Sequence, residues 1–223
     1  MPYFICRSKP HLLATNLKAM FSTLTTQPQL ERLSRPSQLW HSYLRSRHVR
    51  EYGPQYLIVR DPYRRLISFF NDKFRQHPSG VQPALGYEEW QTCQKLFFPY
   101  LGVTRTTKPE EIRGILIDTS FEEFVTLLAN VFQRDGHLRP QNRIRFVSIK
   151  GLEVGTFSVE HTLKMENAAD MQFLSENLGV DTNTRHNATA NKTTDDLYTP
   201  QLLATVNRLY AEDFREYGYD MHT

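Results

Sequence analysis

The stretch Leu57–Phe74, LIVRDPYRRLISFFNDKF, decides the fold because it predicts a buried strand, a charged turn and a helix in immediate succession. The residues before Arg60 form a short apolar run without alternation, which is typical of a strand covered on both faces. Asp61 suits a helix cap and Pro62 suits the first helical position, so we expect a helix to begin at Pro62. Arg60 then lies at the carboxyl edge of a sheet, where open α/β sheets bind ligands.

The helix after Pro62 is expected to be amphipathic. Its apolar face carries Tyr63, Leu66, Ile67, Phe70 and Phe74 at helical spacing. Its polar face is expected to carry Arg64, Arg65, Ser68 and Lys73.

The same segment resembles the 3′-phosphate-binding segment of sulfotransferases that use 3′-phosphoadenosine 5′-phosphosulfate (PAPS). The similarity is greatest to the Golgi-type carbohydrate sulfotransferases and their bacterial relatives. The matching residues are Arg60, Asp61, Pro62, Arg65, Ser68 and Lys73. The resemblance implies that Arg60 and Ser68 hold the 3′-phosphate of the donor. The residues by themselves also allow an ordinary strand, turn and helix in which Arg60 pairs with a carboxylate.

At the amino end, we expect a strand at Tyr3–Cys6, a polar loop at Arg7–His11 and a helix over about Leu12–Leu24. The resembled family has a Pro-Lys pair in the loop after its first strand, with Ser or Thr four residues after the Lys. Counting back from Thr15 and Lys18 sets Pro10 and His11 on that pair. The resemblance then implies that His11 or Lys9 replaces the family lysine at the 5′-phosphosulfate. The residues expected to contact this part of the donor are His11, Ala14, Thr15, Asn16 and Lys18.

Ser120 and Glu123 form a capping box ahead of an apolar helical face that ends near Arg134. The following segment, Asp135–Gln141, resembles the His-Trp-x-Pro-Gln segment of the same family. Sulfuryl transfer to an alcohol needs a proton acceptor, and histidine suits that role near neutral pH. His137 is the candidate general base, and the competing candidates are Glu160, His161 and Glu166.

Towards the carboxyl end, we expect a strand at Val154–Val159, a helix that ends at Leu178 before Gly179, and a last helix over Pro200–Tyr217. The polar loop Thr182–Thr194 returns to the donor in the resembled family. Its expected phosphate contacts are Arg185, Lys192 and Thr193. The ending Leu209–Tyr219 also resembles these sulfotransferases.

The 223 residues fit one domain, residues 1–223, with residues 76–119 as a variable insertion on the acceptor side. We expect a three-layer α/β/α fold with a mostly parallel sheet and the P-loop-like topology of sulfotransferases.

The charges are scattered and the net charge is only +3, so nucleic acid is not an expected partner. Two cysteines without metal-ligand spacing, no apolar span and no signal peptide favour a reduced, cytoplasmic setting, bacterial or viral. A Golgi setting would require that an anchor had been removed.

The expected reaction is transfer of a sulfuryl group from PAPS to a hydroxyl of a carbohydrate or glycolipid, which leaves 3′-phosphoadenosine 5′-phosphate (PAP) and requires no metal. The first alternative is a relative that binds PAPS or PAP but has impaired catalysis, suggested by the absent Pro-Lys lysine. The second is a P-loop kinase-like phosphotransferase, which the absence of a Gly-Lys-Thr/Ser element disfavours.

Overall fold

The computed structural model of the chain describes residues 3–9, 11–34, 36–38, 40, 53–149, 152–156, 159–182 and 197–223. The chain divides into two compact units. The first unit combines Met1–Asp61 with Gln141–Ala188, and the second combines Pro62–Pro140 with Thr189–Thr223.

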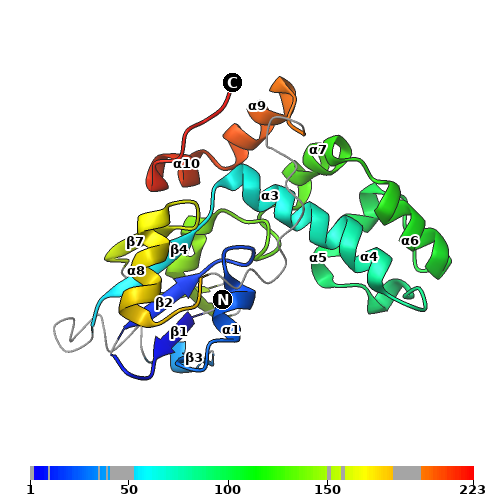
Figure 1. The fold of residues 1–223 in the computed structure, drawn as a ribbon. Helices are drawn as coiled ribbons and strands as arrows, with labels where there is room; N and C mark the ends of the chain where they lie inside the picture. Colours follow the sequence, from blue (N-terminus) through cyan, green and yellow to red (C-terminus); the bar gives the residue numbers. More distant parts are fainter. Residues whose placement is uncertain are drawn as a thin grey trace. The chain divides into compact units, whose positions relative to one another are not determined.

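The first unit contains a five-stranded mixed sheet, which confirms the expected α/β class. Its strand order is β3-β1-β2-β4-β7 (Figure 1). The strands are β1 (Tyr3–Cys6), β2 (Leu12–Thr15), β3 (Leu30–Arg32), β4 (Gln55–Val59) and β7 (His161–Lys164). The β1–β2 and β1–β3 pairs are antiparallel, whereas the β2–β4 and β4–β7 pairs are parallel.

The register of the parallel pairs aligns the carboxyl ends of three strands. Thr15 of β2 pairs with Ile58 of β4, and Val59 of β4 pairs with Lys164 of β7. The segments that follow β2, β4 and β7 therefore leave the sheet at one edge. This is the ligand-binding edge of an open α/β sheet.

The expected helix at Leu12–Leu24 is wrong over Leu12–Met20. Residues Leu12–Thr15 form β2, and helix α1 covers only Phe21–Thr25. The polar loop Arg7–His11 therefore connects two antiparallel strands and does not lead into a helix. An uninterrupted apolar run of this length fits a strand buried on both faces as well as a helix, and all four residues of β2 are buried.

The rest of the first unit consists of helix α8, a 3-10 turn and a separate ladder. Helix α8 covers Ala168–Leu178, and Gly179 closes it with a φ of 63°, as predicted. The 3-10 turn Gln141–Arg145 leads into β5 (Phe146–Ile149), which pairs with β6 (Leu152–Thr156) in a two-stranded antiparallel sheet. The strand expected at Val154–Val159 is thus shifted and belongs to this second sheet. The core of the unit joins the main sheet to α1 and α8 through Phe4, Leu13, Leu24, Tyr56, Ile58, Leu163, Leu174 and Leu178.

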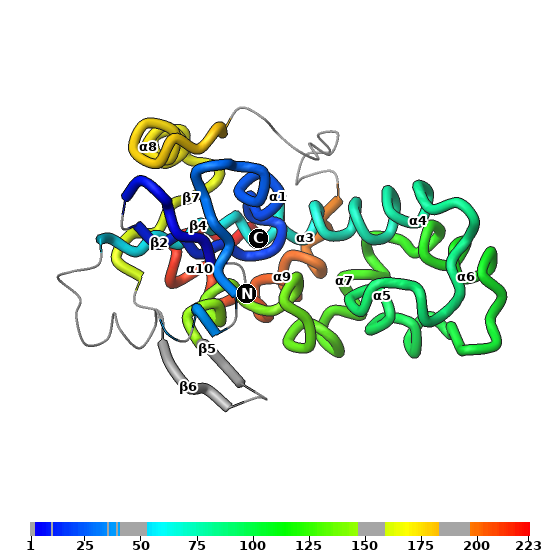
Figure 2. The backbone as a smooth tube through the Cα atoms, turned by 90° about the horizontal axis from the view of Figure 1, so that it is seen from below, coloured from blue at the N-terminus to red at the C-terminus, as the bar shows by residue number. Residues whose placement is uncertain are grey.

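The second unit is built from helices in its described residues (Figures 1 and 2). They are α3 (Pro62–Phe70), a π-helical turn (Asn71–Gln76), α4 (His77–Gly80), α5 (Thr92–Lys95), α6 (Pro109–Asp118), α7 (Phe121–Val131), α9 (Pro200–Leu209) and α10 (Ala211–Tyr217). Short 3-10 turns lie at Tyr87–Glu89 and Phe98–Tyr100. The helix predicted from Pro62 and the Ser120 cap of α7 are confirmed. The expected last helix is divided at Tyr210 into α9 and α10.

Aromatic side chains dominate the core of the second unit. Phe69, Phe70 and Phe74 from the α3 segment contact Phe97 and Phe124, with ring centroids 5.1 to 6.4 Å apart. The predicted apolar face of α3 is buried throughout. Because such rings gain both burial and favourable edge-to-face or offset contacts, they hold α3 against α7 and against Phe97, which follows α5.

Two polar positions on α3 and its extension differ from the prediction. Arg65 is only 2% exposed and Lys73 only 8%, although both were expected on a polar face. Arg65 forms an ion pair with the buried Asp213, and Lys73 pairs with Asp72 at 2.9 Å. The π-helical turn widens the spacing after Phe70, so a count at 3.6 residues per turn misplaces the residues beyond it.

The segment 76–119, expected as a variable insertion, contains α4, α5 and α6 as well as two 3-10 turns. Helices α4 and α6 lie side by side (Figure 2). Trp90, Phe97 and Phe98 are buried, while Tyr100 is 44% exposed. Trp90, Phe97 and Phe98 therefore belong to the core of the second unit.

Among the described residues, none of the helices has both the length and the apolar character needed to cross a membrane. Cys6 and Cys93 are buried free thiols.

Candidate functional site

The edge where β2, β4 and β7 end carries four of the residues predicted to bind the donor, which are Thr15, Asn16, Lys18 and Arg60. Three segments follow these strands: the loop Asn16–Met20, Arg60 with Asp61, and Met165–Asn167. The main chain of the last segment is tied to β4, because Met165 N donates to Val59 O at 3.0 Å. The segments form one connected polar network within the first unit.

The main chain of Arg60 is held by the side chain of Gln141. Arg60 N donates to Gln141 Oε1 at 2.9 Å, and Gln141 Nε2 donates back to Arg60 O at 2.8 Å. Gln141 is fully buried, and its own carbonyl accepts from Asn16 Nδ2 at 3.4 Å. One glutamine therefore joins the ends of β2 and β4, and it fixes the direction in which Arg60 leaves the sheet.

The guanidinium of Arg60 spans the edge from the β2 loop to the β7 segment. Its Nη1 donates to Lys18 O at 3.0 Å, and its Nε lies 3.9 Å from Glu166 Oε1. Glu166 also accepts from Asp61 N at 3.2 Å. The side chain of Arg60 is 24% exposed, so part of a strong hydrogen-bonding fork faces solvent. A partly desolvated arginine of this kind is suited to a phosphate group.

The loop Asn16–Met20 has an unusual backbone. Lys18 and Met20 adopt left-handed conformations with φ of 73° and 60°, while Ala19 between them does not. Non-glycine residues in this region each cost about 1–3 kcal/mol and cluster at ligand sites. Alternation between left- and right-handed residues also turns successive N–H groups towards one point, which makes a concavity for anions.

Hydrogen bonds within the loop hold this conformation. The hydroxyl of Thr15 donates to the carbonyl of Ala19, and Ala19 N donates to Asn16 O at 3.0 Å. Thr15 and Ala14 are fully buried, and Asn16 is 4% exposed. These three residues, which were predicted as donor contacts, are therefore buried and support the loop from the protein interior. Lys18 is partly exposed.

Lys9 and His11 lie at the other end of β2. They precede the strand, and Leu12 pairs with Gln55 at the beginning of β4. At about 3.3 Å per residue, the length of β2 separates them from the Arg60 edge by more than 10 Å. Lys9 Nζ donates to Asn177 O at 2.5 Å, and the His11 ring packs against Tyr56. The predicted strand–loop–helix around them is wrong, so the reason for placing them at the phosphosulfate no longer holds.

The other predicted phosphate contacts lie elsewhere. Ser68 is half-buried on α3, which belongs to the second unit. Arg185, Lys192 and Thr193 lie outside the described residues.

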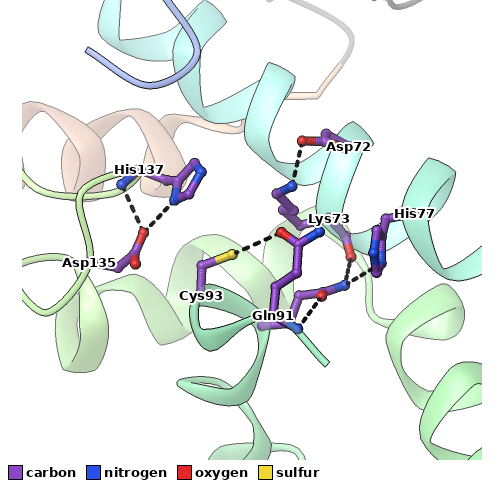
Figure 3. A network of polar contacts seen from close by, with 8 residues as sticks. Asp72, Lys73, His77, Gln91, Cys93, Asp135 and His137 are labelled. Atoms are coloured by element: carbon purple, nitrogen blue, oxygen red, sulfur yellow. Dashed lines mark hydrogen bonds and ion pairs between the residues drawn. The ribbon is translucent and has the colours of Figure 1, made fainter. Parts of the chain in front are cut away.

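The candidate base His137 is paired with a carboxylate. Its Nδ1 lies 2.6 Å from Asp135 Oδ1, and its main-chain N donates to the same oxygen at 2.8 Å (Figure 3). With Nδ1 as the donor, Nε2 is left to accept a proton, which is the arrangement of a base oriented by a carboxylate. Burial by itself would raise the pKa of Asp135, but the His137 hydrogen bonds and the charge of Arg139 bring this pKa below its usual value. Asp135 is therefore ionised at neutral pH.

A buried arginine positions the segment that carries His137. Arg65 Nη2 donates to the carbonyls of His137 at 2.9 Å and Arg139 at 2.6 Å. The hydroxyl of Tyr210 donates to Leu138 O between them. Three consecutive carbonyls are thus bound, which fixes the main chain beside the candidate base. The resemblance to the 3′-phosphate-binding segment included Arg65 but did not imply this positioning role.

The competing bases are used differently. Glu166 faces Arg60, as described above, and His161 stacks on Tyr56 with ring centroids 5.2 Å apart. Glu160 lies at the amino end of β7, where its charge contributes, after burial, to the raised pKa of Tyr56.

Asp135 is the residue of this site that the sequence reasoning missed. Its spacing of two residues from His137 was the available signal.

The parallel strand edge, the left-handed loop and the arginine network define an α/β protein whose sheet edge suits a phosphorylated ligand. The sequence model of the sulfotransferase family matches residues 6–220 of the 223. The chain therefore belongs to the sulfotransferase family, whose general chemistry is sulfuryl transfer. Searches of curated proteins and of solved structures found no significant match.

Proposed function

We propose that this protein transfers a sulfuryl group from PAPS to a hydroxyl of a carbohydrate or glycolipid. The observation that carries the proposal is the Arg60 guanidinium, held at the carboxyl edge of the sheet between Lys18 O and Glu166. Family membership supports the general reaction. The donor and acceptor classes rest on the resemblance of the Arg60 and His137 segments to carbohydrate sulfotransferases.

Lys18 takes the place that was proposed for His11 or Lys9. It lies in a loop that connects a parallel strand to a helix, and Ser22 follows it by four residues, which is the spacing of the resembled pattern. Leu17 stands where that pattern has proline. This assignment supplies the lysine whose absence suggested an impaired relative. The fully active enzyme is therefore the preferred proposal.

Each residue then has a distinct task. PAPS, when bound, supplies the activated sulfuryl group. Arg60 binds its 3′-phosphate, with Ser68 as the second contact implied by the resemblance. The Lys18 ammonium and the N–H groups of its loop bind the 5′-phosphate and stabilise the negative charge that develops there. His137 Nε2 accepts the hydroxyl proton, while Asp135 holds the ring and balances its new positive charge.

Calorimetric titration with PAP and with 5′-AMP tests the donor site. We expect PAP to bind at least about tenfold more tightly, since a charge-assisted phosphate contact contributes roughly 1.5–3 kcal/mol. Arg60→Ala should remove this difference, and Arg64→Ala on the exposed face of α3 is the matched control. Equal affinity for the two nucleotides, or an Arg60→Ala variant that binds like the parent, would refute the donor assignment.

A pair of lysine variants tests the loop assignment. Lys18→Ala should lower the rate of transfer from sulfur-labelled PAPS to carbohydrate acceptors by roughly a hundredfold. Lys9→Ala should leave that rate unchanged, because Lys9 lies at the opposite end of β2. The reverse result would restore the original assignment.

Binding of ATP that requires Mg²⁺, together with phosphate transfer, would instead support the kinase-like alternative.

A further inference from the structure

The second unit contains a group of three potential metal ligands. Sγ of Cys93, a carboxylate oxygen of Asp135 and a ring nitrogen of His137 all lie within 4.8 Å of one another. Cys93 comes from α5, and the other two come from the loop after α7 (Figure 3). Thiolate, imidazole and carboxylate are the side-chain ligands that Zn²⁺ takes in proteins.

We propose that Cys93, Asp135 and His137 form a binding site for a divalent transition-metal ion of the zinc class. Tetrahedral coordination with bonds of about 2.0–2.3 Å places ligand atoms roughly 3.5 Å apart. Nδ1 of His137 and Oδ1 of Asp135 are 2.6 Å apart, so these two atoms must separate by about 0.9 Å. The three ligand atoms all lie within 4.8 Å of one another, so the longest separation must shorten by at most about 1.3 Å. Three protein ligands leave a fourth position for water, which is the arrangement of an open zinc site.

Metal binding changes the protons at the site in a defined way. The S–H bond of Cys93 breaks, its proton passes to the buffer, and the sulfur electron pair binds the metal. The Asp135 carboxylate is already ionised. Coordination through His137 Nδ1 requires the ring proton on Nε2, so the metal replaces the hydrogen bond between His137 and Asp135.

The surroundings favour a cation despite a nearby lysine. Lys73, whose ammonium would repel a metal ion, is paired with Asp72 at 2.9 Å, which neutralises much of its charge. Cys93 is 2% exposed, whereas the side chains of Asp135 and His137 are 17% and 23% exposed. A metal ion therefore reaches the site from the side of these two residues, with the thiol at its base.

A consequence follows that rests on the proposed function. With its proton on Nε2 and a metal on Nδ1, His137 can no longer accept the acceptor's hydroxyl proton. Zinc binding should therefore inhibit sulfuryl transfer, and a chelator should restore it. The binding site itself is tested without donor or acceptor, so its failure is distinguishable from failure of the proposed reaction.

Titration of the apo protein with Co²⁺ is the primary test, because thiolate ligation gives a charge-transfer band in the near ultraviolet and tetrahedral Co²⁺ absorbs strongly in the visible. We expect both signals to saturate at one equivalent. Cys93→Ser should abolish the charge-transfer band, and Asp135→Asn should weaken affinity at least about tenfold. Cys6→Ser removes the other buried thiol and should change neither signal. A missing band in the parent, or one that survives Cys93→Ser, would overturn the site.

X-ray absorption at the zinc edge on the unmodified protein needs no variant, so it decides the matter even if Cys93→Ser does not fold. One sulfur neighbour at about 2.3 Å with nitrogen and oxygen neighbours at about 2.0–2.2 Å supports the site. A shell of nitrogen and oxygen alone refutes it. The inhibition by zinc is then measured on the parent and on Cys6→Ser, and an active enzyme that zinc saturates without any loss of rate would refute the inhibitory consequence.

Discussion

Removal of Asp213 tests whether the buried ion pair organises the second unit. Arg65 Nη1 lies 3.7 Å from Asp213 Oδ2, and the side chains are 2% and 0% exposed. Asp213→Ala leaves the guanidinium without its counter-charge in a site that water hardly reaches. Breaking such a pair from one side costs about 3–5 kcal/mol. For a chain of this size, the loss corresponds to a fall in melting temperature of roughly 6–20 °C.

The double variant Arg65→Met with Asp213→Leu separates charge imbalance from positioning. Replacing both partners by apolar groups removes the unpaired charge, so we expect at least about 2 kcal/mol of stability to return. The carbonyls of His137 and Arg139 still lose their donor, each at roughly 1–3 kcal/mol, so recovery is incomplete. Transfer activity should stay about tenfold or more below the parent, because the segment that holds His137 is no longer fixed.

The assay is chemical and thermal unfolding of the parent, the single variant and the double variant, with initial transfer rates of the folded proteins. The exposed pair Arg105–Glu88, 3.0 Å apart with both side chains more than half exposed, provides the control. Glu88→Ala should change stability by at most about 1 kcal/mol. A double variant no more stable than Asp213→Ala, or an Asp213→Ala loss as small as that of Glu88→Ala, would refute the reasoning.

Three further predictions concern other parts of the chain. Gln141→Leu removes both hydrogen bonds to the Arg60 main chain, so unfolding experiments should show a loss of about 2–4 kcal/mol. Calorimetry should show a PAP affinity at least about tenfold lower, and an unchanged affinity would contradict the role of Gln141 in holding Arg60. Glu166→Gln removes the negative charge that competes for Arg60, and PAP should bind about two- to fivefold more tightly, most clearly at low salt, whereas weaker binding would count against the assignment. Burial lowers the pKa of His77 below its ordinary value of 6.5, so the unfolded chain binds more protons than the folded chain near this pH. The free energy of unfolding should therefore fall as the pH drops through about 6.5. His77→Gln should flatten this pH dependence, and an unaltered slope would contradict the prediction.

The strand, turn and helix around Arg60 could be predicted because each local signal agrees with the tertiary structure. The apolar run is buried on every residue of β4, and the helix begins at Pro62 as the dipeptide indicates. Turn chemistry and burial act on the same few residues here. Consistency of this kind makes a short segment predictable without knowledge of its neighbours.

The first strand pair could not be predicted by the same route. Leu12–Thr15 is short, apolar and without alternation, and periodicity cannot distinguish a buried strand from the beginning of a helix. Tertiary context decides it, because β2 lies between β1 and β4 in the sheet. The polar stretch Arg7–His11, which resembled a ligand loop, connects antiparallel strands.

Buried charges show a second limit of the pattern. Arg65 and Lys73 occupy positions that a helical wheel assigns to solvent, yet each is buried beside a carboxylate. For Arg65 the carboxylate is more than 140 residues away along the chain, so no local window contains the signal. The π-helical turn adds a further displacement for Lys73. Charge at a helical position predicts exposure only where no distant partner is available.

The choice between Lys9 and Lys18 shows why strand direction matters more than spacing for this site. Both lysines flank β2, and both fit a basic residue beside an apolar strand. Because β2 and β4 are parallel, the end of β2 that precedes Lys18 lies at the edge where Arg60 emerges. The end of β2 that follows Lys9 lies at the opposite edge. The Arg60 guanidinium then binds the main chain of Lys18 itself, so the two cationic residues are joined by a hydrogen bond and their positions are coupled. In the proposed assignment, the two phosphate groups lie on one nucleotide, so this coupling would let the donor meet both charges at once.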